Sequence, residues 1–241
     1  TCMMRALQPE ASIAMTEHVI AAAGYEGKIG IAFDEWNLRG WHHPKMPGDP
    51  FRFDVAARDR NDINATYTMA DAVFSAGFLN TCLRHADTVR MANMAPVVNT
   101  RGPLYVHPGG LVKRTTYHVL WMYANLLADR VADAWVSSDA LAKGETAIPA
   151  LDAAVTCDAP MQQWRLALVN RHPAQEIACR LIWNGRPLNG RFFATVPAGD
   201  SADAYNDVQQ PDRVTPAETT FDCVEGILRL PAHSISIVRV A

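Results

Sequence analysis

The stretch 29–37, IGIAFDEWN, indicates the fold class of the first half of the chain. A short apolar run that begins beside glycine is typical of a buried strand. Two acids, an indole and an amide follow this run directly. Carboxylates are costly to bury and contribute little to packing, so acids at the end of a buried strand need another explanation. In a parallel α/β barrel the active site lies at the carboxyl ends of the strands. Glu35 is therefore the first candidate for a catalytic residue.

Side-chain alternation separates Glu35 from the neighbouring acid. Residues two apart on a strand share a face, so Glu35 is expected beside Phe33, and Asp34 on the opposite face. If the larger apolar side chains fill a barrel, Glu35 projects into the pocket above them. Trp36 then offers a flat apolar wall and Asn37 an orienting amide. The alternative is that Glu35 is an ordinary acid of the surface rim.

Helix-like and strand-like segments alternate before residue 128. Apolar spacing predicts helices over about 9–23, 70–85 and 112–127, and short apolar runs predict strands over 28–34 and 88–94. This order predicts parallel strands joined by crossover helices. A (β/α)₈ barrel needs roughly 200 residues. Most of such a barrel would therefore lie outside this chain.

After residue 128 the pattern changes to short strands separated by turns. Strand-like runs cover residues 164–169, 177–183, 226–230 and 234–240. Several short strands at this spacing predict an antiparallel β-sandwich. We therefore expect two domains, residues 1–128 and residues 129–241.

Composition limits the classes of partner. The net charge is −3 and Lys and Arg are dispersed, which argues against nucleic acid or an anionic membrane as a partner. No apolar run approaches the roughly 18–20 residues that span a bilayer. The N-terminal residues show no apolar signal-peptide core. The five cysteines are odd in number and widely spaced, which favours free thiols in the reducing cytoplasm.

The loop after Glu35 carries a second group of candidates. Either Trp41 stacks on a polar substrate to which His42 or His43 bonds, or this stretch is only a structural loop. Adjacent histidines do not easily face one metal ion, and no further ligand lies at suitable spacing, so no metal site is expected. No phosphate-binding glycine loop occurs, and no cofactor is expected. Asn93 ends the second predicted strand, where it either lines the same mouth or caps the next loop.

Several motifs in order resemble the C-terminal half of a glycoside hydrolase family 51 α-L-arabinofuranosidase. The nucleophile signature of that family, D-E-W-N, matches residues 34–37. The other matching stretches are FLNTCLRHAD at 78–87, MANMA at 91–95, Val97-Val98-Asn99, Tyr205-Asn206, Pro211-Asp212 and LPAHS at 230–234.

The resemblance implies a fold and a reaction. The fold is α/β plus all-β: the last two strand–helix units of a (β/α)₈ TIM barrel, followed by a jelly-roll-like β-sandwich. The reaction is retaining hydrolysis of terminal α-L-arabinofuranosyl groups from arabinan or arabinoxylan, with Glu35 as the nucleophile. The partners implied are such saccharides, the missing N-terminal part of the barrel and further copies of the protein in a homo-oligomer. The expected substrate-binding residues are Trp36, Asn37, Trp41, His42, His43, Asn93 and Arg114.

Two departures from the family pattern matter. The acid/base Glu of the family follows an Asn, and no Asn-Glu pair occurs here, so that carboxyl is expected upstream of Thr1. The family often has Arg-Gln-Thr before its last barrel helix, where the Gln reaches the sugar. Here Arg114 replaces that amide. The remaining alternatives are a non-catalytic carbohydrate-binding or assembly module and another retaining barrel glycosidase.

Two barrel strands without their neighbours expose unpaired edges. We therefore predict that this chain, expressed alone, aggregates unless other segments complete the barrel. Light scattering and size-exclusion chromatography check this expectation, and a monodisperse monomer with a cooperative melting transition contradicts it.

Overall fold

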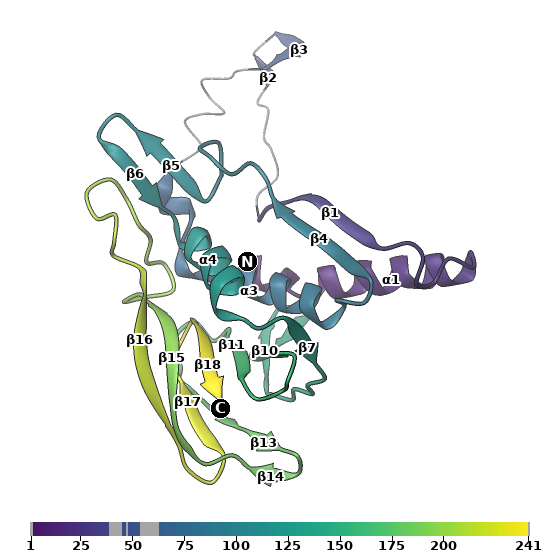
Figure 1. The fold of residues 1–241 in the computed structure, drawn as a ribbon. Helices are drawn as coiled ribbons and strands as arrows, with labels where there is room; N and C mark the ends of the chain where they lie inside the picture. The colour runs from purple at the N-terminus through teal and green to yellow at the C-terminus, as the bar shows by residue number, and fades with distance from the viewer. Residues whose placement is uncertain (1, 39–44, 47, 54–62, 241) are drawn as a thin grey trace.

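The computed structural model describes residues 2–38, 45–46, 48–53 and 63–240. Within these residues the chain consists mostly of β-sheet with few helices. Figure 1 shows a small two-stranded sheet on one side of a helical layer and a larger sheet on the other side. The helices are η1 (Cys2–Arg5), α1 (Gln8–Ala22), η2 (Asn64–Thr66), α3 (Met69–Arg84) and α4 (Thr115–Leu126).

The small sheet pairs β1 (Ile31–Trp36) with β4 (Val89–Met94) in parallel. Helix α3 connects the two strands and packs on them, which confirms the predicted alternation. Strand β1 begins at Ile31, three residues later than the sequence predicts. The amides of Lys28 and Ile29 donate to the carbonyl of Tyr25, at 2.9 and 3.1 Å, and hold these two residues in a turn.

Helix α3 begins at a capping box. The backbone N–H of Thr68 donates to Asp71 Oδ2 at 2.7 Å, and the Thr68 side chain accepts from the amide three residues on, so the first turn satisfies its own polar groups. Helix α4 begins at Thr115, three residues later than predicted. The sequence analysis missed a hairpin of β5 (Leu104–His107) and β6 (Gly110–Lys113), and this hairpin includes Val112.

The larger sheet has six antiparallel strands in the order β16-β15-β18-β11-β10-β7. Their bounds are β7 Arg130–Ala132, β10 Leu151–Cys157, β11 Trp164–Asn170, β15 Gly190–Ala198, β16 Thr215–Cys223 and β18 Ser234–Val240. Besides β1–β4 and β5–β6, the described residues form four more two-stranded sheets. These are β12 (Ile177–Arg180) with β17 (Ile227–Leu230), β13 (Ile182–Trp183) with β14 (Arg186–Pro187), β8 (Ala140–Lys143) with β9 (Thr146–Pro149), and β2 (Lys45–Met46) with β3 (Asp49–Phe53). The four predicted strands are present, and one of them is split at Leu181 into β12 and β13.

The central strands β10, β11 and β18 of the six-stranded sheet are buried on both faces. Along β11, Ala167 and Val169 join a cluster with residues of α3 and α4, whereas Leu166 and Leu168 join a second cluster with β12 and β17. This alternation is the period-2 pattern of a strand between two apolar layers. The predicted boundary after residue 128 lies between α4 and β7, and the first cluster spans it. The division into two domains stays a prediction.

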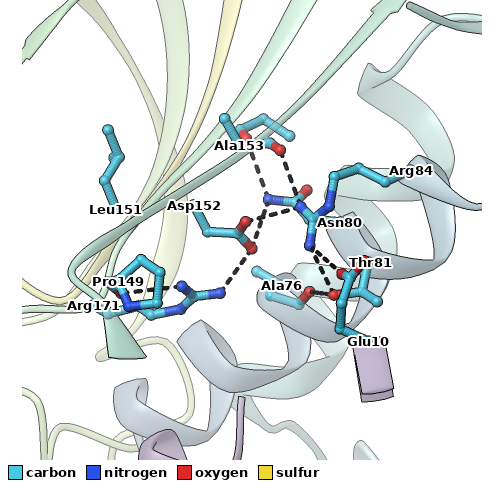
Figure 2. Close-up of polar contacts among 12 residues, drawn as sticks. Glu10, Ala76, Asn80, Thr81, Arg84, Pro149, Leu151, Asp152, Ala153 and Arg171 are labelled. Carbon is cyan, nitrogen blue, oxygen red and sulfur yellow. Dashed lines mark hydrogen bonds and ion pairs between the residues drawn. The ribbon is translucent and has the colours of Figure 1, made fainter. Parts of the chain in front are cut away.

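A buried charge network joins α3 to the six-stranded sheet (Figure 2). Asp152 on β10 lies between two guanidinium groups. Its Oδ1 is 2.8 Å from Arg84 Nη1, and its Oδ2 is 2.9 Å from Arg171 Nη2. Asn80 donates to the same carboxylate at 3.4 Å, and its own Oδ1 accepts from the Tyr123 hydroxyl at 2.7 Å. The Asp152 carboxylate and the Arg171 guanidinium are therefore buried with compensating partners, and the Arg84 side chain is partly exposed.

The same network holds α1. Arg84 Nη2 is 3.1 Å from Glu10 Oε2, and the ring of His85 lies 2.7 Å from Glu10 and 2.9 Å from Glu17. His85 follows the last residue of α3, where a cation also favours the helix dipole. Burial alone lowers the pKa of His85, but the hydrogen bonds and charges of Glu10 and Glu17 outweigh it and raise the pKa. Burial raises the pKa of Glu10, and the partners His85 and Arg84 outweigh that effect and lower it.

Several smaller findings concern the chain as a whole. None of the described helices is long and apolar enough to cross a membrane. The four cysteines Cys82, Cys157, Cys179 and Cys223 are buried free thiols, as predicted for them. Burial raises the pKa of Cys82 to about 12, although the nearby Arg84 opposes this, and raises the pKa of Cys179 to about 11.

We predict that Asp152→Ala destabilises the fold by about 3–5 kcal/mol, because it leaves the buried guanidinium of Arg171 and the partly exposed one of Arg84 without their carboxylate. The urea midpoint of a soluble preparation measures the effect. The matched control is Asp222→Ala, which breaks a pair in which both side chains are about 70% exposed (Arg191 70%, Asp222 69%). That control should leave the midpoint nearly unchanged, and an equal loss in both variants contradicts the role of the network.

We predict that the attachment of α1 depends on pH. A raised pKa means that folding favours protonated His85, so this stabilisation is complete below about pH 6.5 and is lost as the pH rises through the folded-state pKa. The lowered pKa of Glu10 means that folding favours its ionised form. This stabilisation is complete above about pH 4.5 and is lost as the pH falls through the folded-state pKa of Glu10. Hydrogen-exchange protection of α1 should therefore decrease above pH 6.5, and His85→Gln should abolish that decrease. Equal pH dependence in both proteins refutes the assignment.

Candidate active site

The candidate site lies where two parallel strands end side by side. Ala32 pairs with Met91, Phe33 with Ala92, and Trp36 with Met94, so the carboxyl ends of β1 and β4 meet at one edge of the small sheet. This is the edge at which parallel α/β folds place their ligands. The structure therefore brings the segment around Glu35 next to the segment around Asn93.

An irregularity in β1 changes the predicted direction of Glu35. Three steps from Phe33 to Trp36 pair with two steps on β4, so β1 carries one extra residue at Asp34 and Glu35. Both aromatic rings flanking this bulge contact Phe78 of α3, with centroids at 5.3 Å and 4.3 Å. The expectation that Glu35 shares the face of Phe33 is therefore wrong. The regular period of two, on which it depended, is interrupted between these residues.

The bulge leaves both acids exposed. Neither Asp34 nor Glu35 belongs to the apolar cluster that contains Trp36 and Phe78. Asn93 is also exposed and lies across from the bulge, between the paired residues Ala92 and Met94. The two acids and the Asn93 amide are thus all exposed near the carboxyl ends of the paired strands β1 and β4.

Trp36 and Asn37 are engaged within the chain. The Trp36 side chain is only 7% exposed and packs on Phe78. The side-chain amide of Asn37 donates to the carbonyls of Ala95 and Arg101, both at 3.1 Å. These contacts fix the end of β1 to the connection that follows β4. Contact of either side chain with a saccharide stays a prediction.

Arg114 is fully buried at the start of α4. Its Nε donates to Asn64 Oδ1 at 2.8 Å, and its Nη1 donates to the carbonyl of Gly102 at 2.9 Å. The guanidinium carbon lies 4.0 Å from the ring centroid of Tyr67 and 5.1 Å from that of Tyr105. The predicted contact between Arg114 and the sugar is untested, but the observed partners are all parts of this chain.

Three predicted site residues cannot be placed. Trp41, His42 and His43 lie outside the described residues. Within the described residues no group of three His, Cys, Asp or Glu side chains is arranged to hold a metal ion.

Sequence reasoning missed the β4–β5 connection, residues 95–103, as part of the site. Its backbone accepts the bonds from Asn37 and Arg114. The dipeptide Gly102-Pro103 is a turn signal that marks this segment in the sequence. Nothing in the spacing alone, however, indicates that it folds back to the end of β1.

Comparison with known proteins identifies the class as that of α-L-arabinofuranosidases. Residues 34–234 match the family model described as the α-L-arabinofuranosidase C-terminal domain. The chain therefore belongs to this family, and the resemblance predicted from its motifs to the C-terminal half of a family 51 enzyme is confirmed.

Relatives and solved structures agree with this assignment. The chain is 28% identical over 249 residues to a probable α-L-arabinofuranosidase C of Aspergillus fumigatus, covering 97% of this chain and 45% of the relative. It is 32% identical over 168 residues to an intracellular exo-α-(1→5)-L-arabinofuranosidase of Halalkalibacterium halodurans, covering 68% and 33%. The chain thus spans less than half the length of these relatives.

The fold is shared with solved structures of the same class. The α-L-arabinofuranosidase of Thermotoga maritima, in complex with arabinose, aligns with a TM-score of 0.78 at 20% identity, over 98% of this chain and 48% of that chain. A family 51 α-L-arabinofuranosidase of Bifidobacterium longum aligns with a TM-score of 0.72 at 25% identity, over 95% and 47%.

Proposed function

We propose that this chain is the half of a retaining α-L-arabinofuranosidase that supplies the nucleophile, and that Glu35 is that nucleophile. The observation that carries the proposal is the exposed carboxylate of Glu35 at the carboxyl end of β1, inside the matched family region. A strand-end carboxylate is suitably placed to attack an anomeric carbon held above the small sheet.

The proposed fold follows from the same arrangement. Strands β1 and β4 with helices α3 and α4 are the last two strand–helix units of a (β/α)₈ barrel, in residues 1–128. The six-stranded sheet and the smaller sheets that pack on it are a jelly-roll-like sandwich, in residues 129–241. The parallel pairing of β1 with β4 and the helical layer beside it support the first part. The two apolar layers of the six-stranded sheet support the second.

The chemistry requires a second carboxyl group. A retaining glycosidase places its acid/base about 5–5.5 Å from the nucleophile, where it protonates the leaving oxygen and later deprotonates water. Asp34 is the adjacent residue of the same bulge and has no separate strand to place it across the sugar. The acid/base is therefore assigned to the part of the enzyme that the relatives possess beyond this chain.

The proposed substrates are saccharides with terminal α-L-arabinofuranosyl groups, as the names of the relatives suggest. The proposed location is the cytoplasm, supported by the intracellular relative and by the free thiols. The functional enzyme is proposed to be a homo-oligomer. The proposed substrate-binding residues are Trp36, Trp41, His42, His43 and Asn93. For Asn37 and Arg114, which the sequence also predicts to bind substrate, the bonds to Ala95, Arg101 and Gly102 support a positioning role instead.

We predict that Glu35→Gln in the full-length enzyme lowers kcat for an aryl α-L-arabinofuranoside by on the order of 10⁴-fold or more, because the covalent intermediate cannot form. A continuous or a stopped assay of the released aryl group measures kcat. The matched control is Glu26→Gln, which changes an exposed acid in the turn before β1 and should leave kcat unaltered.

A chemical rescue separates a nucleophile from an acid/base. In Glu35→Gly, azide can enter the vacated space and attack the anomeric carbon while the aryl group leaves. The product is then an arabinofuranosyl azide of inverted configuration. Near-wild-type turnover of Glu35→Gln, or an azide product of retained configuration, refutes the nucleophile assignment.

A further inference from the structure

The connection between β4 and β5, residues 95–103, has a backbone that is costly to maintain. Asn99, Thr100 and Arg101 have φ angles of 49°, 34° and 72°, so three successive residues with side chains occupy the left-handed region. Such residues are disfavoured and persist only where surrounding contacts hold them. The connection therefore requires fixed anchors.

Part of this anchoring lies inside the connection. The amide of Asn99 donates to the carbonyl of Leu104 at 2.7 Å, and the amide of Gly102 donates to the carbonyl of Asn99 at 2.6 Å. A Cβ atom at Gly102 would lie 2.4 Å from the backbone of Val97, so the two arms of the loop touch. These bonds close the loop on itself but do not attach it to the end of β1.

At the first residue of the loop, the amide of Ala95 donates to the carbonyl of Trp36, the last residue of β1, at 3.2 Å. Two side chains from other elements hold the far end of the loop. Asn37 donates to the carbonyl of Arg101 from the end of β1, and Arg114 donates to the next carbonyl, that of Gly102, from the start of α4. Adjacent peptide groups are thus held from two sides. The second N–H of the Asn37 amide donates to Ala95 at the other end of the loop.

The donor groups of Asn37 are fully used by these contacts. A side-chain amide has two N–H groups, and Asn37 Nδ2 donates two bonds, both to backbone carbonyls, which accept and cannot donate. The nitrogen of Asn37 therefore has no N–H left for a sugar oxygen while the loop keeps this conformation.

Arg114 is itself rigidly held. Its Nε donates to Asn64 Oδ1, and Asn64 Nδ2 donates at 2.9 Å to Asp207, in the connection between β15 and β16. The guanidinium plane is covered by Tyr67 at 4.0 Å. The attachment of the loop thus extends from β1 to the sheet-rich half of the chain.

We propose that Asn37 and Arg114 are positioning residues that fix residues 95–103 as a wall beside Glu35. The proposal rests on the proposed function of Glu35, because Asn37 follows the bulge of Glu35 by two residues. A shift of the loop then also shifts the strand end that carries the carboxylate. Displacement by about 1 Å lowers the rate of an enzyme by up to about 100-fold.

The test uses the full-length enzyme and an aryl α-L-arabinofuranoside. Asn37→Asp keeps the shape of the side chain but places a carboxylate against two carbonyl oxygens. Arg114→Lys keeps the charge but loses the planar fork that reaches Asn64 and Gly102 together. The matched control is Asn125→Asp, at an exposed position near the end of α4. Each protein is measured for kcat, KM, melting temperature and hydrogen exchange in residues 95–103.

We expect kcat to fall about 10–100-fold in Asn37→Asp and in Arg114→Lys, with KM changed less than about 3-fold. Hydrogen exchange should become faster in residues 95–103, while the melting temperature and exchange elsewhere stay close to wild type. The double variant should lose little more than either single variant, because both act on one loop. Asn125→Asp should match the wild type in every measurement.

Three results overturn the proposal. A raised KM with unchanged kcat would show that the two side chains bind substrate directly. Unchanged kcat and unchanged exchange in residues 95–103 would show that the attachment has no role. Faster exchange throughout the enzyme, with a lower melting temperature, would show a general structural role.

Failure of the proposed function gives a different result. In that case the wild type releases no aryl group from the arabinofuranoside, or Glu35→Gln retains turnover. The kcat values of Asn37→Asp and Arg114→Lys then do not report on the position of a nucleophile. Hydrogen exchange in residues 95–103 still reports whether Asn37 and Arg114 hold the loop.

Discussion

The buried carboxylate of Asp152 is the interaction on which the relative placement of helices and sheet depends. It neutralises Arg84 from α3 and Arg171, the residue after β11. The carboxylate and Arg171 are buried, whereas Arg84 is partly exposed. Desolvating three charged groups is expensive, and the arrangement is tolerable only because each group also has hydrogen-bond partners. Arg84 continues to Glu10, so α1 is attached through the same residue. Apolar packing alone would permit α3 to slide on the sheet, whereas these directional bonds fix one position.

Helix α3 transmits that position to the candidate site. The face that carries Val73 and Ala76 packs on the six-stranded sheet, and the face that carries Phe78 and Cys82 packs on β1 and β4. Because Phe78 contacts both Phe33 and Trp36, the bulge with Glu35 is held between two aromatic contacts. The sheet-rich half of the chain therefore contributes to the geometry of the catalytic edge although none of its strands reaches that edge.

Part of the fold could be predicted because several elements follow simple apolar periods or runs. The helical spacing of α3 and the apolar runs of β4, β11 and β18 identified those elements within one or two residues. The strands β10, β15 and β16 were missed although they have 7, 9 and 9 residues, because Asp, Gly, Pro and other polar residues interrupt their apolar runs. The β5–β6 hairpin and the short strands β7, β8, β9 and β14 were missed as well. At the site, the position of Glu35 at a strand end was predictable. The direction of the Glu35 side chain was not predictable, because the bulge depends on how β1 pairs with β4. The burial of Arg114 was not predictable either, because its partners Asn64, Tyr67 and Gly102 reach it only through the folding of the chain.

Because β1 contains a bulge, the direction of the candidate nucleophile depends on how many residues lie between Phe33 and Trp36, and not only on which residues they are. Phe33 and Trp36 both return to α3 only because two residues stand between them where a regular strand has one. Removing either acid restores strict alternation and leaves the remaining one as the sole residue between the two aromatic rings. Any design that transfers this strand end to another barrel must therefore keep the number of residues in the bulge as well as their amino-acid types.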